Sequence, residues 1–461
     1  MEGNDVSQHS TVIQTSATKL ARIEVKSRQE PELVFSNLGH IIDELLLREC
    51  FNSLDGSKAV GIDGVTKASY GKGLNENLPS LLNKIRKGIY IPKPSRVVEI
   101  PKLDGTTRPL AIACTEDKIV QEACKRILER IFEPIFLPVS FGFRPGSNQH
   151  KALVALNGHL NSPNNGAVLD VDLRMAFDTI PHNHLEEMLG RKIADKRFLY
   201  LLMKLIKAEV IGKSGKVEKN ACGVPQGSIL SPLLCNVFLH YVVDTWFEKV
   251  NEEMFLKRCT LVRFADDKVL TAPNLVAAKQ LQELLRKRLE LFGMQLHEGK
   301  TRVLLNGRAA AKASALGGAK VGGFTFLGFL HVWGVSRNRK TGKMFWRIKL
   351  RTCPKRFRAK LSAITENIKK QRHNKQLVEK MKAVVRGYLN YFAINDNMNR
   401  VNMFVFTVRK ILYKWLNRRS QKRSMNWEEF NQMLIKANFP KPKLQHNLFF
   451  TTSAFEKERC R

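Results

Sequence analysis

The spacing of apolar and polar positions predicts several helices. Residues 37–54 carry apolar side chains at helical spacing. A second helix is predicted for the segment TEDKIVQEACKRILERIF, with Thr115 as its N-cap. Further along, Ser231 and Pro232 predict a helix start, with the serine as the cap and the proline at the first helical position.

Other segments have the pattern of strands or of irregular chain. Residues 90–112 combine apolar runs, four prolines and the turn sequence LDGTT, which predicts a β-hairpin. Residues 166–180 begin with the alternation typical of a strand. Residues 1–30 are polar, and we expect them to be frayed; residues 309–323 are rich in Gly and Ala, which predicts a flexible loop. The fold class is therefore α+β.

The charge changes this picture, because it is concentrated at one end of the chain. The 461 residues include 77 Lys+Arg and 42 Asp+Glu, a net charge of +35. Residues 337–461 hold 32 of these basic and 7 of the acidic residues, a net +25, which leaves +10 for the rest. Beyond residue 350 the apolar period is helical, as in residues 405–423. A basic helical region of this kind predicts a polyanionic partner, and we expect nucleic acid.

The cysteines and the N-terminus point to the cytosol. The eight cysteines form no CxxC pair, so we expect reduced thiols and no zinc site. The N-terminal segment fits neither a secretory signal nor a transit peptide. No apolar run approaches the ~18 residues of a membrane span, and we expect no membrane association.

Two acidic segments carry the candidate chemistry. TLVRFADDKVLTA (260–272) places Asp266 and Asp267 between two strand-like runs, and VLDVDL places Asp170 and Asp172 on one face of another strand. Taken alone, the Asp pair is more often a solvated turn, and the second pair an exposed strand face. If the two strands are neighbours, however, three carboxylates converge, and divalent cations would make that arrangement favourable. Two Mg²⁺ ions about 4 Å apart are the usual apparatus for in-line phosphoryl displacement.

The order of the motifs decides between these alternatives. DLRMAFDTIPH (172–182), GVPQGSILSPLLCNVFLH (223–240) and VRFADD (262–267) resemble the palm of reverse transcriptases, with FADD where YADD is usual. The resemblance extends to the group II intron reverse transcriptase/maturase family, bacterial type, over about residues 35–450. It is carried by further segments in the family's order: GIDGVT, IPKLDGTTRPLAI, FGFRPGSNQHKAL, LHEGKT, FTFLGF, GYLNYF and WLNRRSQKRSMNWEEF.

This resemblance implies a right-hand polymerase fold, with fingers, an antiparallel palm sheet packed by helices, and an α-helical thumb or maturase domain. The expected limits are a polar extension at 1–34, the N-terminal extension and fingers at 35–165, the palm at 166–335, the thumb at 336–450 and a tail at 451–461. We expect no C-terminal endonuclease module, because the tail holds only Cys460.

The resemblance also implies the catalytic residues. Asp172, Asp266 and Asp267 match the family's metal-binding and catalytic triad, with two Mg²⁺ ions as cofactors. Asp170 is the rival for the first place, and Asp178 matches a structural member of the motif. Asp172 is preferred because Phe177 follows it by five residues, at the place of the aromatic gate that excludes a 2′-hydroxyl. The alternative for Phe177 is core packing.

Four more residues match the family's nucleotide-binding positions. Lys102 and Arg108 match the triphosphate-binding pair, Gln226 the residue that lines the nascent base-pair pocket, and Lys300 a lysine near the outgoing pyrophosphate. Ordinary surface cations are the alternative for the three basic residues. Arg144 either organises the fingers or contacts the template backbone.

The basic C-terminal region is expected to bind RNA. Its candidate phosphate contacts are Arg409, Lys410, Lys414, Arg418, Arg419, Lys422 and Arg423. Tyr388, Tyr391 and Trp427 are either stacking partners for bases or core aromatics, and the core is the more common role.

These expectations define an RNA-directed DNA polymerase, a nucleotidyltransferase, that is also an intron maturase. Its expected partners are group II intron RNA, template RNA, primer or target DNA, and dNTPs, and its expected location is the bacterial cytoplasm, at the nucleoid. The alternatives are a catalytically silent splicing cofactor and a reverse transcriptase that serves defence or diversification.

Overall fold

The computed structural model describes residues 15–101, 105, 107–212, 215–338, 341–418 and 425–448. Mixed helices and mainly antiparallel sheets confirm the α+β class. The chain forms two units: one contains residues 1–145, 173–249 and 284–296, and the other contains residues 146–172, 250–283 and 297–461. Helices α10 (Thr245–Phe255) and α11 (Leu275–Leu291) contain residues of both.

The first unit is mainly helical, with one small sheet. Its sheet has the order β2-β1-β4-β5, and the β1–β2 hairpin confirms the prediction for residues 90–112. Its elements are α1 (Ser16–Gln29), η1 (Gly39–Ile41), α2 (Glu44–Ser53), α3 (Lys67–Lys72), α4 (Leu74–Arg86), β1 (Ser95–Pro101), β2 (Thr107–Ile112), α5 (Thr115–Phe132), η2 (Glu133–Ile135), α7 (His182–Gly190), α8 (Lys196–Ile206), β4 (Val210–Ile211), β5 (Val217–Glu218), α9 (Ser231–Leu239) and η3 (His240–Asp244).

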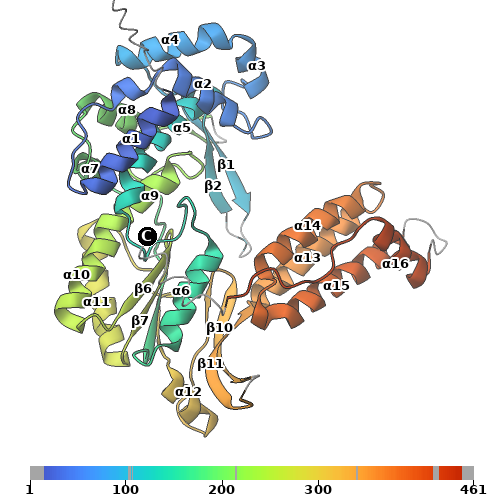
Figure 1. Cartoon of the computed structure of the whole chain (residues 1–461). Helices are drawn as coiled ribbons and strands as arrows, with labels where there is room; N and C mark the ends of the chain where they lie inside the picture. The colour runs from blue at the N-terminus through green and yellow to red at the C-terminus, as the bar shows by residue number, and fades with distance from the viewer. Residues whose placement is uncertain are drawn as a thin grey trace, which may run out of the picture. The chain divides into compact units, whose positions relative to one another are not determined.

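The second unit contains two sheets and a helical bundle. One sheet has the order β6-β7-β3-β8, with α6 beside β6 and β7 (Figure 1), and the other has the order β11-β10-β9. Its elements are α6 (Gln149–Asn161), β3 (Ala167–Val171), β6 (Thr260–Phe264), β7 (Asp267–Ala272), β8 (Arg302–Leu305), α12 (Arg308–Ala315), β9 (Phe324–Phe326), β10 (Phe329–Arg337), β11 (Met344–Thr352), α13 (Pro354–Lys370), α14 (Leu377–Phe392), η4 (Asn395–Asn397), α15 (Met398–Leu416) and α16 (Trp427–Lys436).

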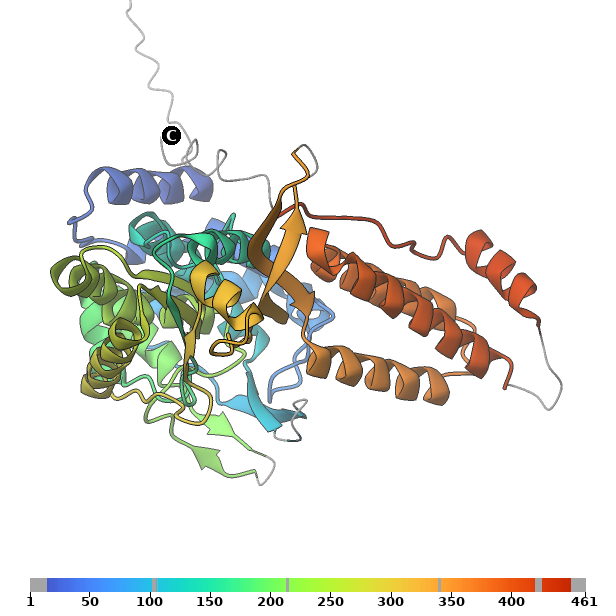
Figure 2. The same ribbon diagram turned by 90° about the horizontal axis from the view of Figure 1, so that it is seen from below.

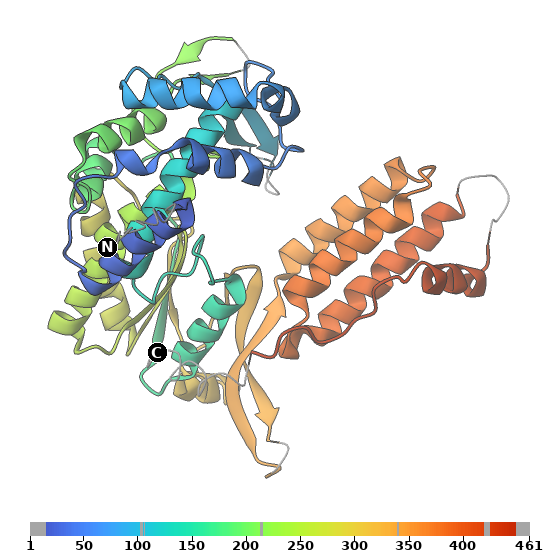
Figure 3. The same cartoon turned by 45° about the horizontal axis from the view of Figure 1, so that its top comes forward.

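We call α13–α16 the C-terminal bundle. Figures 2 and 3 show its three long helices side by side, in orange to red. Its core is a single apolar cluster centred on α14 and α15, with Phe404, Val408 and Leu412 fully buried at helical spacing. The helical prediction for this region is therefore confirmed, although α15 begins seven residues before 405 and residues 419–424 lie outside the described part of the chain.

Three predictions about local structure were wrong. Residues 16–29 are not frayed: they form α1, whose Leu20 and Ile23 are buried and whose Ser27 hydroxyl donates to the Ile131 carbonyl at 2.6 Å. The helix predicted at 37–54 is divided, because the carboxylate of Asp43 accepts from the Leu46 amide and caps a new helix, α2. The predicted loop at 309–323 contains α12, since alanine favours a helix as strongly as any residue.

Both predicted serine or threonine caps were displaced by one residue. Cys114 holds the N-cap position of α5, and the Thr115 hydroxyl donates instead to the Val65 carbonyl at 2.7 Å. Leu230 holds the N-cap position of α9, and the Ser231 hydroxyl donates to the Pro225 carbonyl at 2.8 Å. In each case the hydroxyl is used to hold a loop against the helix start.

Candidate active site

A tight hairpin presents the Asp266–Asp267 pair. Phe264 and Asp267 are the last paired residues of β6 and β7, so Ala265 and Asp266 form a two-residue turn. Ala265 has φ +57°, a conformation that a first turn residue adopts in a type II′ hairpin. The Lys268 ammonium donates to the Asp266 carbonyl at 2.8 Å, which holds the turn from a fully buried position.

The neighbouring strand brings Asp172 to the same place. β3 pairs with β7 in antiparallel register, and its last pair is Val171 with Lys268. One step further along the same register, Asp172 comes opposite Asp267. Both carboxylates line one recess of about 600 Å³. The two acidic strands are therefore neighbours, which was the condition for their carboxylates to converge.

The charges in this recess are unevenly compensated. Asp170 pairs with Arg302 at 2.8 Å, across the β3–β8 register, so its charge is met by the protein. Asp172 has a looser partner in Lys300, whose Nζ lies 3.6 Å from Oδ2. This difference supports Asp172 over Asp170 as the first member of the triad.

Asp267 has a raised pKa, although the charges of Lys268 and Arg356 act in the opposite direction. As a residue it is exposed, but crowding of its carboxyl by protein atoms and the negative charges of Asp266 and Asp172 raise its pKa to about 6. Asp266 thus lies within electrostatic reach of Asp267, although it is not part of the lining of the recess.

The residues present fit an open Mg²⁺ site rather than a closed one. Within the described ranges, no group of three His, Cys, Asp or Glu side chains is already drawn together around a metal position. Mg²⁺ commonly uses one or two carboxylates and takes its other ligands from water and substrate phosphates. Carboxylates on either side of one recess, with a raised pKa at Asp267, are suited to such an ion.

Three basic residues of the recess were missed by the sequence analysis. Arg302, Lys355 and Arg356 line it together with Lys300. Lys355 and Arg356 belong to the first turn of α13, where the helix dipole disfavours cations. That unfavourable placement, visible in the segment CPKRFR, is the signal that could have identified them.

In the first unit, two of the predicted nucleotide-binding residues, Phe177 and Gln226, lie at one loop. Gln226 donates to both carboxylate oxygens of Asp178, at 2.9 and 2.8 Å, and the carbonyl of Phe177 accepts from the Val224 amide at 2.8 Å. The Ala111 amide donates to the Gln226 carbonyl at 2.6 Å and ties the loop to β2, on which Arg108 is exposed. A small pocket of about 180 Å³ lies beside Asp178 and Gln226.

Gly227 shows why this loop has the sequence PQG. Its φ is +108°, and a Cβ built there would lie 2.6 Å from the Ala111 carbonyl oxygen. Only glycine combines that backbone conformation with so close an approach.

The other predicted contacts divide into several groups. Lys102, Arg419, Lys422 and Arg423 lie outside the described residues. Arg144 is 13% exposed, pairs with Glu133 at 2.8 Å and donates to two carbonyls, so it organises its own loop, and these contacts argue against direct RNA contact. Lys410, Lys414 and Arg418 are exposed on or just after α15, whereas Arg409 is half-buried and bonded to Asn431.

Of the three candidate stacking residues, one is buried and two are half-buried. Tyr388 is 5% exposed and stacks on Phe404, with ring centroids 3.5 Å apart. Tyr391 donates to the Leu327 carbonyl at 2.9 Å, and Trp427 packs against Tyr413. Tyr388 is therefore a core residue, whereas Tyr391 and Trp427 each keep part of the ring surface exposed while packing within the unit.

Comparison with known families accounts for both parts of the chain. Residues 91–331, more than half of the chain, match the family described as reverse transcriptase (RNA-dependent DNA polymerase), to which the protein therefore belongs. Residues 354–432, which span most of the C-terminal bundle, match the group II intron, maturase-specific domain.

Curated relatives agree with this assignment. The chain is 37% identical over 204 residues to a putative COX1/OXI3 intron 2 protein of Saccharomyces cerevisiae, covering 44% of this chain and 23% of the relative. It is 38% identical over 191 residues to protein YkfC of Escherichia coli, a match that covers 41% of this chain and 50% of the relative. It is 32% identical over 225 residues to the group II intron-encoded protein LtrA of Lactococcus lactis subsp. cremoris, a match that covers 48% of this chain and 37% of the relative. The matched region thus spans at most half the length of these relatives.

Among the helices that the structure describes, none combines the length and the apolar character needed to cross a bilayer.

Proposed function

We propose that the protein is an RNA-directed DNA polymerase and intron maturase, which binds group II intron RNA, promotes its splicing and copies RNA into cDNA for intron mobility. The observation that carries this proposal is the recess shared by Asp172 and Asp267, in a chain that matches the reverse transcriptase family and the maturase-specific domain in succession.

The proposed catalytic residues are Asp172, Asp266 and Asp267, as ligands for two Mg²⁺ ions. When bound, these ions neutralise the charge that develops on the attacking and leaving oxygens. Lys300, 3.6 Å from Asp172, is placed to exchange that partner for the pyrophosphate of an incoming nucleotide. Lys355 and Arg356 add positive charge to the same recess, which favours phosphate entry.

The remaining proposed substrate contacts are Lys102 and Arg108 for the triphosphate, Phe177 for exclusion of the 2′-hydroxyl, and Gln226 for the base pair. The bonds from Gln226 to Asp178 and to β2 support this, because they fix the loop that would meet the nucleotide. Arg409, Lys410, Lys414, Arg418, Arg419, Lys422 and Arg423 remain the proposed contacts to RNA phosphates.

The polymerase architecture follows from the same proposal. The sheet β6-β7-β3-β8 supplies the palm, the β1–β2 hairpin the fingers, and the C-terminal bundle the thumb. The limits 35–165, 166–335 and 336–450 are proposed for fingers, palm and thumb. The proposed partners are group II intron RNA, template RNA, primer or target DNA and dNTPs, and the proposed location is the bacterial cytoplasm at the nucleoid.

Primer extension tests the proposal. With Mg²⁺ and dTTP, the protein is expected to extend oligo(dT) on poly(rA), and Asp266→Ala is expected to abolish extension. Glu366→Ala, which removes an exposed carboxylate of α13 outside the recess, is the matched control and is expected to extend normally. A wild-type protein that binds intron RNA but does not extend the primer would instead be a silent splicing cofactor.

A further inference from the structure

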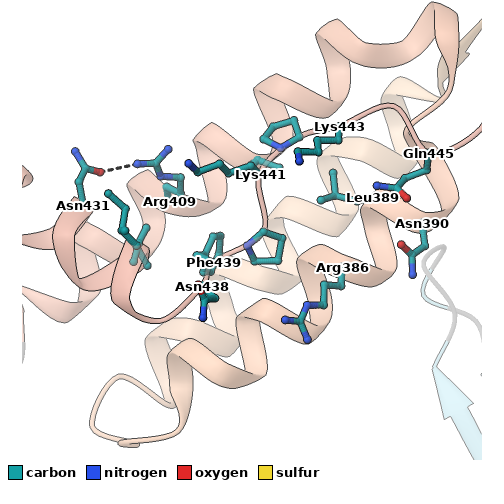
Figure 4. Close-up of a pocket in the computed structure, with 15 residues that line it drawn as sticks. Arg386, Leu389, Asn390, Arg409, Asn431, Asn438, Phe439, Lys441, Lys443 and Gln445 are labelled. Atoms are coloured by element: carbon teal, nitrogen blue, oxygen red, sulfur yellow. Dashed lines mark hydrogen bonds between the residues drawn. The ribbon is translucent and has the colours of Figure 1, made fainter.

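A groove on the C-terminal bundle combines several cations and carboxamides (Figure 4). It has a volume of about 460 Å³ and is formed by α14, α15, α16 and the chain that follows α16. We call it the basic groove and define it by Arg386, Asn390, Arg409, Asn431, Lys441 and Lys443. Its volume is within the range of about 300–1,000 Å³ that is usual for ligand pockets.

The sequence builds the two sides of the basic groove rigidly. On α14, Arg386 and Asn390 are one helical turn apart and share a face. Opposite them, Lys441 and Lys443 alternate with two prolines, which restrict φ and reduce the freedom of the segment. Both lysines line the groove, on the segment that follows α16 (Figure 4).

The lysine-bearing segment is anchored at both ends. Before it, Phe439 is 8% exposed in the core of the bundle, and its amide donates to the Leu434 carbonyl at 2.9 Å. After it, the Gln445 amide donates to the Ala393 carbonyl at 2.9 Å. The two lysines are therefore held in position before any ligand arrives, which lowers the entropic cost of binding.

Within the part of the chain that the structure describes, the positive charge of the basic groove has no acidic partner. Its described lining contains no acidic residue, and none of its four cations forms an ion pair within the described ranges. Arg409 donates only to the neutral Asn431, at 2.5 Å, and its Nε is buried without an acceptor in the part of the chain that the structure describes. A buried donor of this kind costs free energy until an acceptor is supplied.

We infer that the basic groove binds a single-stranded segment of RNA, with phosphates on the four cations. The carboxamides of Asn390 and Asn431 can both donate and accept hydrogen bonds, as the 2′-hydroxyl does, so they provide a means of preferring RNA to DNA. The inference rests on the proposed function and deepens it, because it assigns an RNA contact to a face other than that of Lys410 and Lys414.

The test removes charge inside and outside the basic groove. Lys441→Gln/Lys443→Gln is compared with Lys370→Gln/Lys375→Gln, an exposed pair of the same bundle that lies outside the groove. Fluorescence anisotropy gives the Kd for an unstructured RNA 20-mer and for DNA of the same sequence, and thermal melting by circular dichroism checks the fold. If the groove double variant does not melt like the wild type, Arg386→Gln, an exposed change, replaces it.

The groove variant is expected to bind RNA about tenfold or more weakly, and its log–log salt slope is expected to fall by about 1.4, for two lost contacts. The control is expected to stay within about threefold of the wild type. Equal weakening in both variants, or equal affinity of the wild type for RNA and DNA, would overturn the inference. Stronger competition by poly-glutamate than by RNA would also overturn it, in favour of an acidic protein partner. Primer extension by the wild type tests the polymerase proposal separately, so the two can fail independently.

Discussion

At the scale of single residues, the ion pair of Lys300 with Asp172 is expected to contribute little to folding stability. The pair links two exposed side chains, 59% and 38% accessible, at 3.6 Å. Such surface pairs contribute about 0–1 kcal/mol to folding, so the ammonium can leave its partner at little cost.

Lys300→Gln is therefore expected to raise the KM for dNTP about tenfold while the melting temperature stays within about 2 °C of the wild type. Steady-state primer extension and thermal melting are the two measurements. Lys312→Gln, an exposed change on α12, provides the control. A large fall in melting temperature with an unchanged KM would assign Lys300 a structural role only.

Phe177 allows a similar separation of roles. The side chain is half-buried, and the backbone carbonyl accepts from the Val224 amide and so holds the loop. If it acts as the sugar gate, Phe177→Ala raises incorporation of rNTPs relative to dNTPs by about tenfold or more, because the bulk that excludes the 2′-hydroxyl is gone. Tyr200→Ala, at a residue that is 59% exposed in the same unit, serves as the control.

The comparison is made with each nucleotide type in single-turnover extension. Loss of melting temperature by several degrees, with unaltered sugar discrimination, would instead mean that Phe177 is a packing residue.

At the scale of elements, the sheet β11-β10-β9 contains a buried titratable ring. His331 of β10 is 1% exposed and stacks on Phe324, its register partner in β9, with centroids 4.8 Å apart. Burial lowers its pKa from 6.5 to about 4, because the charged ring would be desolvated. The unfolded chain therefore binds a proton at His331 as the pH falls below 6.5, whereas the folded chain does so only near pH 4.

This difference makes His331 a source of acid sensitivity. Its contribution is fully present above pH 6.5 and is lost as the pH falls toward 4, by about 1–3 kcal/mol. His331→Phe keeps an aromatic ring but has no proton site, so it does not lose this stability in acid. The difference between its melting temperature and that of the wild type is therefore expected to shift in favour of the variant as the pH is lowered from 7 to 4.5. A constant difference across this range would contradict the assignment.

The elements also show how far sequence reasoning reaches. Asp172 and Asp267 could be predicted to approach each other, because strand alternation and the antiparallel register of β3 and β7 leave few other arrangements. Asp43 was missed as a cap because the apolar pattern continues across it, and α12 was missed because Gly and Ala together suggested flexibility more than helix propensity. The cations at the start of α13 mark Lys355 and Arg356 as candidates, but local patterns do not encode that this helix begins beside the recess.

At the scale of the whole molecule, the excess of basic residues and the proposed catalytic carboxylates lie in different parts of the sequence. Residues 337–461 carry +25 of the net +35, whereas the three carboxylates proposed for catalysis all precede residue 268. The C-terminal bundle has an apolar cluster of its own, so those of its surface cations that lie outside the recess can bind phosphates without being needed for the folding of the acidic recess.

RNA affinity is therefore expected to depend steeply on salt and only slightly on the recess. Seven phosphate contacts at about 0.7 each give a log–log slope near −5 for single-stranded RNA, and the three other cations of the basic groove steepen it to about −7. Asp266→Ala, which is expected to abolish cDNA synthesis, should leave this slope and the Kd within error of the wild type. A flat salt response would remove the phosphate-contact account, and parallel loss of RNA binding and polymerisation in Asp266→Ala would mean that one surface serves both. Filter binding between 50 and 400 mM KCl, with primer extension on the same preparations, distinguishes these results.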